Sequence, residues 1–285
     1  MRASTHFNIA LPTIGGQAMW TDHATRSGWR VQVHALTGHA RLLDPTNRRR
    51  AWGPHASVDA TFHQRAPRPA TRPRHVVVLV HGLGGNSLTF RTMRRTLRAD
   101  GYIVATFKYA SALTQIDDQA TALCHFIEGL EADSITLIGQ SMGGIVVDRA
   151  LAHGAFQGSH LNIGRCRIRG VVRIGTPCGG SAFASGIVAS VGAARLTRTP
   201  LAEVATGLPL DAISDRIVHL NIAGSLNGAR GLNPLIDGPD DGLVGLSEVA
   251  RGDTTHTIIV HASHYGLTSH PETLKAARVF LQGVT

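Results

Sequence analysis

A serine stands between two glycines in the segment Gly139-Gln-Ser-Met-Gly143, which has the pattern G-x-S-x-G. An apolar run at 135–138 precedes the pattern, and a helix-like segment at 142–153 follows it. A sharp strand-to-helix turn forces its central residue into strained backbone angles, and flanking glycines leave room for that turn. The pattern therefore predicts that Ser141 projects its hydroxyl above a sheet as a nucleophile. The alternative is a tight connection with an incidental serine.

A second glycine-rich segment, His81-Gly-Leu-Gly-Gly85, follows the apolar run 76–80. Backbone N–H groups in such a loop can point into a site and stabilise the oxyanion of a tetrahedral intermediate. The amides of Leu83, which follows His-Gly, and of Met142, which follows the serine, are the expected donors. A phosphate-binding loop is the alternative, but the segment lacks both the lysine of G-x-x-x-x-G-K-[ST] and the Rossmann glycine spacing.

A serine hydroxyl is a weak nucleophile near neutral pH, so it needs a histidine base that a carboxylate orients. The C-terminal third contains His256, His261, His264 and His270. His261 ends an apolar run and His270 precedes Pro271 at an expected helix start, so each has a structural role available. His264 lies in the loop between them and is the predicted base.

The predicted carboxylate is Asp241, which precedes Gly242 and can lie in a turn anchored by the apolar residues that follow. Asp237, Asp240 and Asp253 are competitors, and calcium binding or turn capping is the alternative role for any of them. The four histidines with Asp240 could also form a metal cluster. Their spacing matches neither H-E-x-x-H nor a zinc finger, and a strand puts alternate residues on opposite faces, so we expect no metal site.

The composition is that of a folded globular protein. Of the 285 residues, 43% are hydrophobic and 16% are charged, which argues against disorder. Three cysteines without C-x-x-C spacing suggest neither a disulfide scaffold nor a zinc ribbon. The first residues contain no continuous apolar segment typical of a secretory signal, and the uncharged stretch 174–194 is mostly small residues. We therefore expect a cytoplasmic protein without a membrane span.

The net charge of +9 is concentrated near the N-terminus. Residues 1–74 contain 11 arginines and three acidic residues, whereas the rest of the chain is nearly balanced. These arginines could meet phosphates or anionic lipid head groups, but an arginine-rich solvated surface is the simpler interpretation. We expect at most weak association with an anionic membrane surface, and no nucleic-acid partner.

The elements that must position these residues alternate along the chain. Apolar runs typical of buried parallel strands alternate with helical segments, which indicates an α/β domain whose sheet is covered on both faces. The predicted strands are 76–80, 103–107, 135–138, 171–174, 217–222 and 258–260, and the predicted helices are 88–99, 115–130, 142–153 and 271–281. We interpret residues 1–285 as a single domain.

Two segments stand outside this alternation. Residues 1–74 contain a β-hairpin signal at 29–43 and a proline-rich connector at 65–74. Residues 181–210 interrupt the alternation, and we interpret them as a small helical cap with a second short helix beginning at 200. Its first helix has one apolar stripe, formed by Phe183, Ile187, Val188 and Val191.

Five motifs, in their order along the chain, resemble the α/β-hydrolase superfamily and in particular its bacterial lipase and esterase branch. They are HGLGG (81–85), GQSMGG (139–144), GTPCGGS (175–181), DDGLV (240–244) and SHYGL (263–267). The resemblance covers residue 76 to the C-terminus, and the first 75 residues match nothing assignable. In that family the catalytic residues run Ser, Asp, His along the chain, an order that Ser141, Asp241 and His264 keep.

The resemblance implies an α/β-hydrolase fold with a mostly parallel central sheet and a cap after the Gly-Thr-Pro segment. It also implies ester hydrolysis through an acyl-enzyme, without a cofactor, on a small-molecule or lipid ester. Two alternatives stay open. The same residues could process a thioester or an amide, or the fold could be a binding module without catalytic activity.

Overall fold

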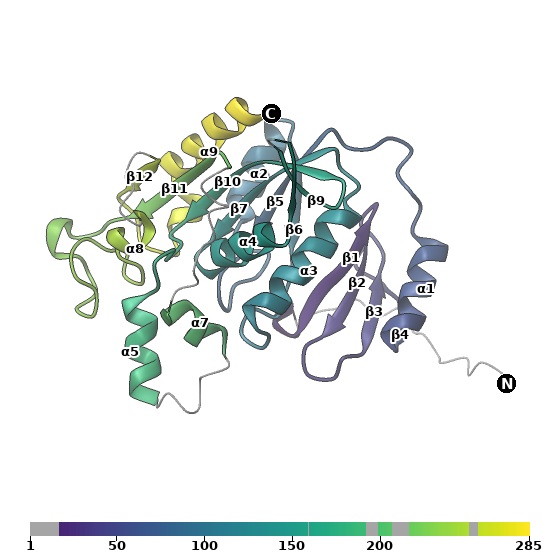
Figure 1. The fold of residues 1–285 in the computed structure, drawn as a ribbon, viewed down its shortest axis with the longest axis horizontal. Helices are drawn as coiled ribbons and strands as arrows, with labels where there is room; N and C mark the ends of the chain where they lie inside the picture. The colour runs from purple at the N-terminus through teal and green to yellow at the C-terminus, as the bar shows by residue number, and fades with distance from the viewer. Residues whose placement is uncertain (1–16, 159, 192–198, 207–216, 251–255) are drawn as a thin grey trace.

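The computed structural model describes residues 17–158, 160–191, 199–206, 217–250 and 256–285. Its centre is an eight-stranded sheet, in which six parallel strands run in the order β12-β11-β10-β7-β5-β6 (Figure 1). These strands are β5 (His75–Val80), β6 (Ile103–Phe107), β7 (Ser134–Gln140), β10 (Cys166–Ile174), β11 (His219–Gly224) and β12 (Thr257–Val260). The predicted parallel sheet is confirmed.

Alternate residues of β5 point into two different apolar layers. Val76 and Val78 belong to a core with α3 (Ile116–Gly129) and α4 (Met142–Ala152). Val77 belongs to a second core on the other face, with α2 (Arg91–Ala99) and α9 (Pro271–Val284). The strand is apolar throughout because both of its faces are buried. The fold therefore has three layers, as expected.

Two short strands extend the sheet beyond the prediction. β9 (His160–Ile163) pairs antiparallel with the beginning of β10, and β8 (Ala155–Gln157) pairs antiparallel with β9. Because of this hairpin, the sheet has antiparallel strands beside the beginning of β10 and parallel strands elsewhere.

The N-terminal segment is a sheet of its own. β1 (Trp20–Arg26), β2 (Trp29–His34), β3 (Ala40–Leu43) and β4 (Arg49–Gly53) form four antiparallel strands, after a short 3₁₀ turn at Gln17–Met19. The helix α1 (His55–Arg65) covers one face of this sheet through Val58 and Phe62. The predicted hairpin corresponds to β2 and β3, and the predicted connector carries neither helix nor strand after residue 65.

The small sheet is joined to the main domain along β1, which runs beside α3 (Figure 1). A Cβ atom added at Gly129 of α3 would lie 2.3 Å from the carbonyl oxygen of Thr25, so only glycine allows this approach. Asp22 also exchanges backbone and side-chain hydrogen bonds with Lys108, at 2.8 and 3.1 Å. The small sheet is thereby tied to the residue that follows β6.

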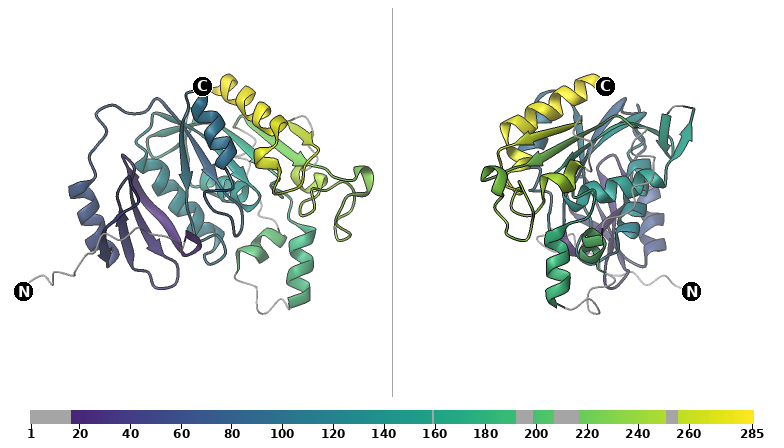
Figure 2. Two further views of the ribbon diagram at one scale, coloured as in Figure 1. Left: turned by 180° about the vertical axis from the view of Figure 1, so that it is seen from behind. Right: turned by 60° about the vertical axis from the view of Figure 1, so that its left-hand side comes forward.

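The predicted cap contains two helices, α5 (Ala182–Val191) and α7 (Pro200–Thr206), on the opposite side of the molecule from α9 (Figure 2). Ser181 N–H donates to the carbonyl of Val204 at 3.1 Å, which joins the two helices. Of the predicted stripe, Phe183, Ile187 and Val188 are half-buried, and the side chain of Val191 lies outside the described part. Residues 192–198 and 207–210 of the predicted cap also lie outside it. No helix in the described ranges has the length and apolarity that crossing a bilayer requires.

Candidate active site

Ser141 stands alone between the end of β7 at Gln140 and the start of α4 at Met142. Its backbone angles are φ 54° and ψ −132°, which a residue with a side chain rarely adopts. Its N–H donates to the carbonyl of Ile174 in β10 at 2.8 Å. The serine is therefore held in a strained turn at the carboxyl end of the central strands, as the sequence predicts.

The glycines around Ser141 are required by close backbone contacts. A Cβ atom at Gly143 would lie 2.3 Å from the carbonyl oxygen of Val80, and one at Gly139 would lie 2.5 Å from Cα of Gly144. Atoms this close clash, so a larger residue would push α4 away from the ends of β5 and β7. The glycines of the motif thus fix where the serine stands.

The loop His81–Gly85 lies against the same turn. Gly82 N–H donates to Gln140 Oε1 at 3.1 Å, and Gly84 N–H donates to Ser111 Oγ at 3.0 Å. A Cβ atom at Gly82 would lie 2.8 Å from Cβ of Ser141. Among the described residues, the amides of Leu83 and Met142, the two predicted oxyanion donors, have no acceptor.

His81 anchors the start of this loop. Its ring is buried, stacks on Tyr109 with centroids 4.4 Å apart, and donates from Nδ1 to the carbonyl of Gly82 at 2.9 Å. Burial lowers the pKa of His81 to about 4, so the ring is neutral at neutral pH. The Tyr109 hydroxyl donates to the carbonyl of His81, and burial raises the pKa of Tyr109.

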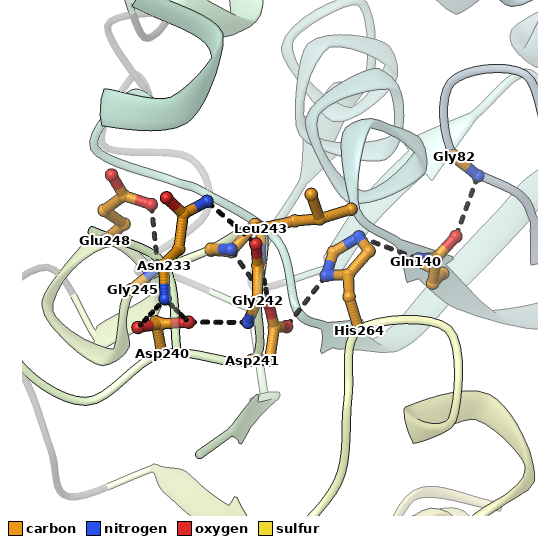
Figure 3. Close-up of polar contacts among 11 residues, drawn as sticks. Gly82, Gln140, Asn233, Asp240, Asp241, Gly242, Leu243, Gly245, Glu248 and His264 are labelled. Carbon is orange, nitrogen blue, oxygen red and sulfur yellow. Dashed lines mark hydrogen bonds and ion pairs between the residues drawn. The ribbon is translucent and has the colours of Figure 1, made fainter. Parts of the chain in front are cut away.

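Asp241 and His264 form a buried pair (Figure 3). His264 Nδ1 lies 2.8 Å from Asp241 Oδ2, and the His264 backbone N–H donates to the Asp241 carbonyl at 2.9 Å. Asp241 Oδ1 accepts the amides of Leu243 and Val244 at 3.0 and 2.8 Å. Both oxygens of the carboxylate therefore have partners, and its orientation toward the histidine is fixed.

The competing residues have other positions. The Asp240 carboxylate is fully buried and accepts the amides of Leu232, Asn233 and Gly242, so it holds the turn rather than a histidine. His270 caps α9 by accepting the Glu272 N–H at 3.3 Å. Asp237, His256 and His261 are exposed, and Asp253 lies outside the described residues. Within the described ranges, no three His, Cys, Asp or Glu side chains are grouped as metal ligands would be.

One residue of the site was not predicted. Gln140 Nε2 lies 3.1 Å from His264 Nε2, while Gln140 Oε1 accepts from Gly82, so a polar chain runs from the loop through Gln140 and His264 to Asp241 (Figure 3). Ser141 directly follows Gln140, but in the described structure no hydrogen bond joins its hydroxyl to His264. The only sequence signal for Gln140 is its place before the serine.

Comparisons with known proteins place the fold. No protein-family model and no curated protein matches the chain. Among solved structures, it is similar to the mature lipase BlEst2 of Bacillus licheniformis, with 20% identity, a TM-score of 0.56, and coverage of 78% of this chain and 95% of that chain. A carboxylesterase structure from the thaumarchaeon Nitrososphaera gargenis matches with 15% identity and a TM-score of 0.51, over 74% of this chain and 91% of that chain.

A bromoperoxidase of Bacillus anthracis also matches, with 16% identity and a TM-score of 0.50, over 74% of this chain and 92% of that chain. The sheet order, the turn at Ser141 and these similarities all indicate the same fold. The chain has the α/β-hydrolase fold.

Proposed function

We propose that this protein is a serine hydrolase that cleaves carboxylic esters with Ser141, His264 and Asp241. The observation that carries the proposal is the buried Asp241–His264 pair. The other ring nitrogen of His264, Nε2, lies 3.1 Å from the side chain of Gln140, which directly precedes Ser141. A buried histidine paired with a carboxylate and set beside a serine in a strained turn is an arrangement suited to acyl transfer. The fold alone does not define the chemistry, since the similar structures include a bromoperoxidase besides a lipase and a carboxylesterase.

In the first step, Ser141 Oγ attacks the ester carbonyl carbon while His264 Nε2 takes the hydroxyl proton. The tetrahedral intermediate then collapses, the bond to the leaving alcohol breaks, and His264 returns the proton to that alcohol. In the second step, a water molecule gives a proton to His264 and attacks the acyl carbon. The bond to Ser141 Oγ then breaks, His264 returns the proton to Oγ, and the carboxylic acid leaves. These steps use groups of this protein and a water molecule, and need no cofactor.

Asp241 supports both steps. Its carboxylate holds the proton of neutral His264 on Nδ1 and stabilises the imidazolium that forms when Nε2 accepts a proton. The two amide donors to its other oxygen keep it oriented toward the histidine.

The amides of Leu83 and Met142 are the proposed oxyanion donors. Their neighbours Gly82 and Gly84 are occupied by Gln140 and Ser111, which leaves Leu83 as the free donor of that part of the loop. Free N–H groups fixed beside the reacting carbonyl stabilise charge where it develops.

The surroundings of the site favour an apolar ester. Several exposed large apolar side chains come from loops that follow the carboxyl ends of β5, β6, β11 and β12, the edge of the sheet where Ser141 stands. They are Leu83, Leu88, Leu113, Leu232, Leu235 and Tyr265. An apolar rim of this kind favours small-molecule or lipid esters with an apolar acyl or alcohol part.

We also propose that the protein works in the cytoplasm. Cys124, Cys166 and Cys178 are buried and form no disulfide in the described structure, which is compatible with a reducing compartment.

The test is a substrate panel with a matched pair of variants. We expect wild-type protein to hydrolyse p-nitrophenyl esters between acetate and palmitate, and Ser141→Ala to lose about 10⁴-fold or more in kcat while it keeps its melting temperature. Ser269→Ala, which changes an exposed serine of the 3₁₀ turn Leu267–Ser269, should leave activity unchanged. Preference for the matching thioester or anilide would change the substrate class, and equal rates for wild type and Ser141→Ala would contradict the proposal.

A further inference from the structure

Gln140 reaches two parts of the candidate site with one side chain. Its Oε1 accepts the Gly82 N–H of the oxyanion loop at 3.1 Å, and its Nε2 lies 3.1 Å from Nε2 of His264 (Figure 3). The side chain is buried, and a Cβ atom at Gly82 would lie 2.8 Å from its oxygen. Glycine at position 82 is what lets the carboxamide come this close.

The Gly82 contact determines the direction of the two hydrogen bonds that follow it, from Gln140 to His264 and from His264 to Asp241. A backbone N–H can only donate, so the atom that faces Gly82 is the amide oxygen of Gln140. The atom that faces His264 is then the NH₂ group, which donates and cannot accept. Neutral His264 must accept at Nε2, and its ring proton is on Nδ1, where it is donated to Asp241 at 2.8 Å.

This arrangement places Gln140 and Ser141 in competition. A neutral imidazole has one acceptor lone pair in its ring plane, and Gln140 occupies it here. Ser141 must donate to the same lone pair before its proton can be transferred. The structure therefore shows a resting arrangement, in which the base has the correct tautomer but is held by its neighbour.

We propose that Gln140 is a positioning residue that holds His264 as a proton acceptor and couples it to the oxyanion loop. The proposal rests on the proposed function of Ser141 and His264. When Nε2 has taken the serine proton, its N–H and the Gln140 NH₂ group are both donors, so the contact becomes repulsive. The imidazolium is then directed away from Gln140 toward the leaving oxygen, which accepts the proton.

Other titratable groups near His264 do not supply this polarity. In the described structure these groups are Asp241 on Nδ1 and the exposed Tyr265, whose ring lies edge-on with centroids 5.8 Å apart. His81, beyond Gly82, is neutral because burial lowers its pKa to about 4. Gln140 is therefore the residue whose substitution should alter the protonation of His264 at Nε2.

Two variants separate the two contacts of Gln140. Gln140→Glu keeps an oxygen for the Gly82 N–H but puts an acceptor against His264 Nε2, while Gln140→Met removes both contacts at similar volume. Gln32→Met is the matched control, because Gln32 is equally buried and bonded, to Asp22 and Arg41, in the N-terminal sheet. The measurements are ¹⁵N NMR of the His264 ring and the pH profile of kcat/KM for p-nitrophenyl butyrate.

We expect wild-type His264 to carry its proton on Nδ1 at pH 8. In Gln140→Glu the ring should stay doubly protonated to higher pH, so the half-maximum of kcat/KM should move up by about one pH unit or more. In Gln140→Met the Nε2 resonance should shift as its donor is lost, and kcat should fall several-fold with little change in KM. Gln32→Met should change stability only.

An unchanged pH profile in Gln140→Glu, or wild-type His264 protonated on Nε2, would overturn the proposal. A decrease of kcat in Gln140→Met that only follows the loss of folded protein, as in Gln32→Met, would also overturn it. If Gln140→Glu does not fold, the wild-type and Gln140→Met spectra decide. If wild-type protein hydrolyses no ester, the proposed function fails, whereas the NMR spectra still report whether Gln140 contacts His264.

Discussion

At the scale of single residues, two adjacent aspartates have different environments although both are buried. One oxygen of Asp241 accepts two backbone amides and the other contacts His264. Both oxygens of Asp240 accept only backbone amides of the surrounding loop. The difference between them is the contact with the histidine. A comparison of the two positions therefore separates a catalytic role from a structural one.

We expect Asp241→Asn to lower kcat by roughly 10³–10⁴-fold, because an amide in place of Oδ2 favours the wrong tautomer of His264. Asp240→Asn should cost about 1–3 kcal/mol of unfolding free energy and change kcat of the folded protein only slightly. Ester turnover and urea denaturation of both variants provide the measurement. Equal losses of kcat in the two variants would mean that Asp241 acts only through the turn.

Two helical glycines provide a second comparison. We expect Gly143→Ala to destabilise the fold by about 1–3 kcal/mol, because its Cβ atom would lie 2.3 Å from a backbone oxygen of β5. Gly283→Ala in α9 has nothing within 4 Å of the new Cβ atom and should stabilise the protein by roughly 0.5–1 kcal/mol. Urea unfolding measures both. Similar values for the two variants would show that the α4 contact does not constrain the serine turn.

The residues of the site could be predicted to different depths. Ser141 stood out because strand, glycines and helix follow one another in the sequence, and His264 could be separated from His261 and His270 by the structural roles of those two residues. Gln140 could not be predicted, because its role depends on where a carboxamide points after folding. Sequence spacing carries no information on that direction.

At the scale of elements, the predicted strands and helices of the main domain are confirmed, and the central strands have the clearest signal because their apolar runs are buried on both faces. The hairpin β8–β9 was not predicted, since its strands have three and four residues without an apolar run. The strands β1 and β4 were also not predicted, because neither sequence alternates regularly between apolar and polar residues. Helix α1 buries only Val58 and Phe62, a signal too weak to identify it.

The cap helix α5 combines core and surface features. Ala184 is buried with the main core, whereas Phe183, Ile187 and Val188 are only half-buried, and a Cβ atom at Gly186 would lie 3.3 Å from Leu235 of the loop that precedes Asp241. The helix therefore adjoins a loop of the proposed substrate rim. Its half-buried stripe stays a predicted determinant of acyl-chain length.

We expect Ile187→Asp to lower kcat/KM for long acyl esters about tenfold more than for acetate esters, because a carboxylate in the stripe removes apolar contact with a long chain. Ala189→Asp changes an exposed position of the same helix and should leave the ratio unchanged. The long-to-short activity ratio and the melting temperature are measured together. A lower melting temperature with an unchanged ratio would show that α5 only fills space against the sheet.

At the scale of the whole molecule, the N-terminal sheet is connected to the candidate site through the residues that follow β6. Asp22 bonds Lys108, Tyr109 stacks on His81, and Ser111 accepts the Gly84 N–H. The described part of the basic segment, residues 17–74, is therefore packed onto the domain. Arg48, Arg65 and Arg68 are exposed on it, and its association with an anionic membrane surface stays a prediction.

We expect weak binding to phosphatidylglycerol vesicles that decreases steeply with salt, since exposed charges are screened beyond about 10 Å at 0.1 M. Replacement of Arg48, Arg65 and Arg68 by Gln should weaken binding roughly 100-fold, at about 1 kcal/mol per arginine. Replacement of the exposed Arg91, Arg95 and Arg230 changes the net charge equally and should matter much less. Co-sedimentation at two salt concentrations measures this, and equal, negligible binding to neutral and anionic vesicles would leave only a solvated basic surface.

The central claim is that Ser141 is a nucleophile activated by His264. The most direct measurement is the reaction of the protein with a fluorophosphonate, followed by mass spectrometry of the intact chain and of its peptides. We predict one covalent adduct per chain, located on Ser141, absent in Ser141→Ala and formed at least about 10³-fold more slowly in His264→Ala. No adduct on wild-type protein, or an adduct on another residue that persists in Ser141→Ala, would contradict the account.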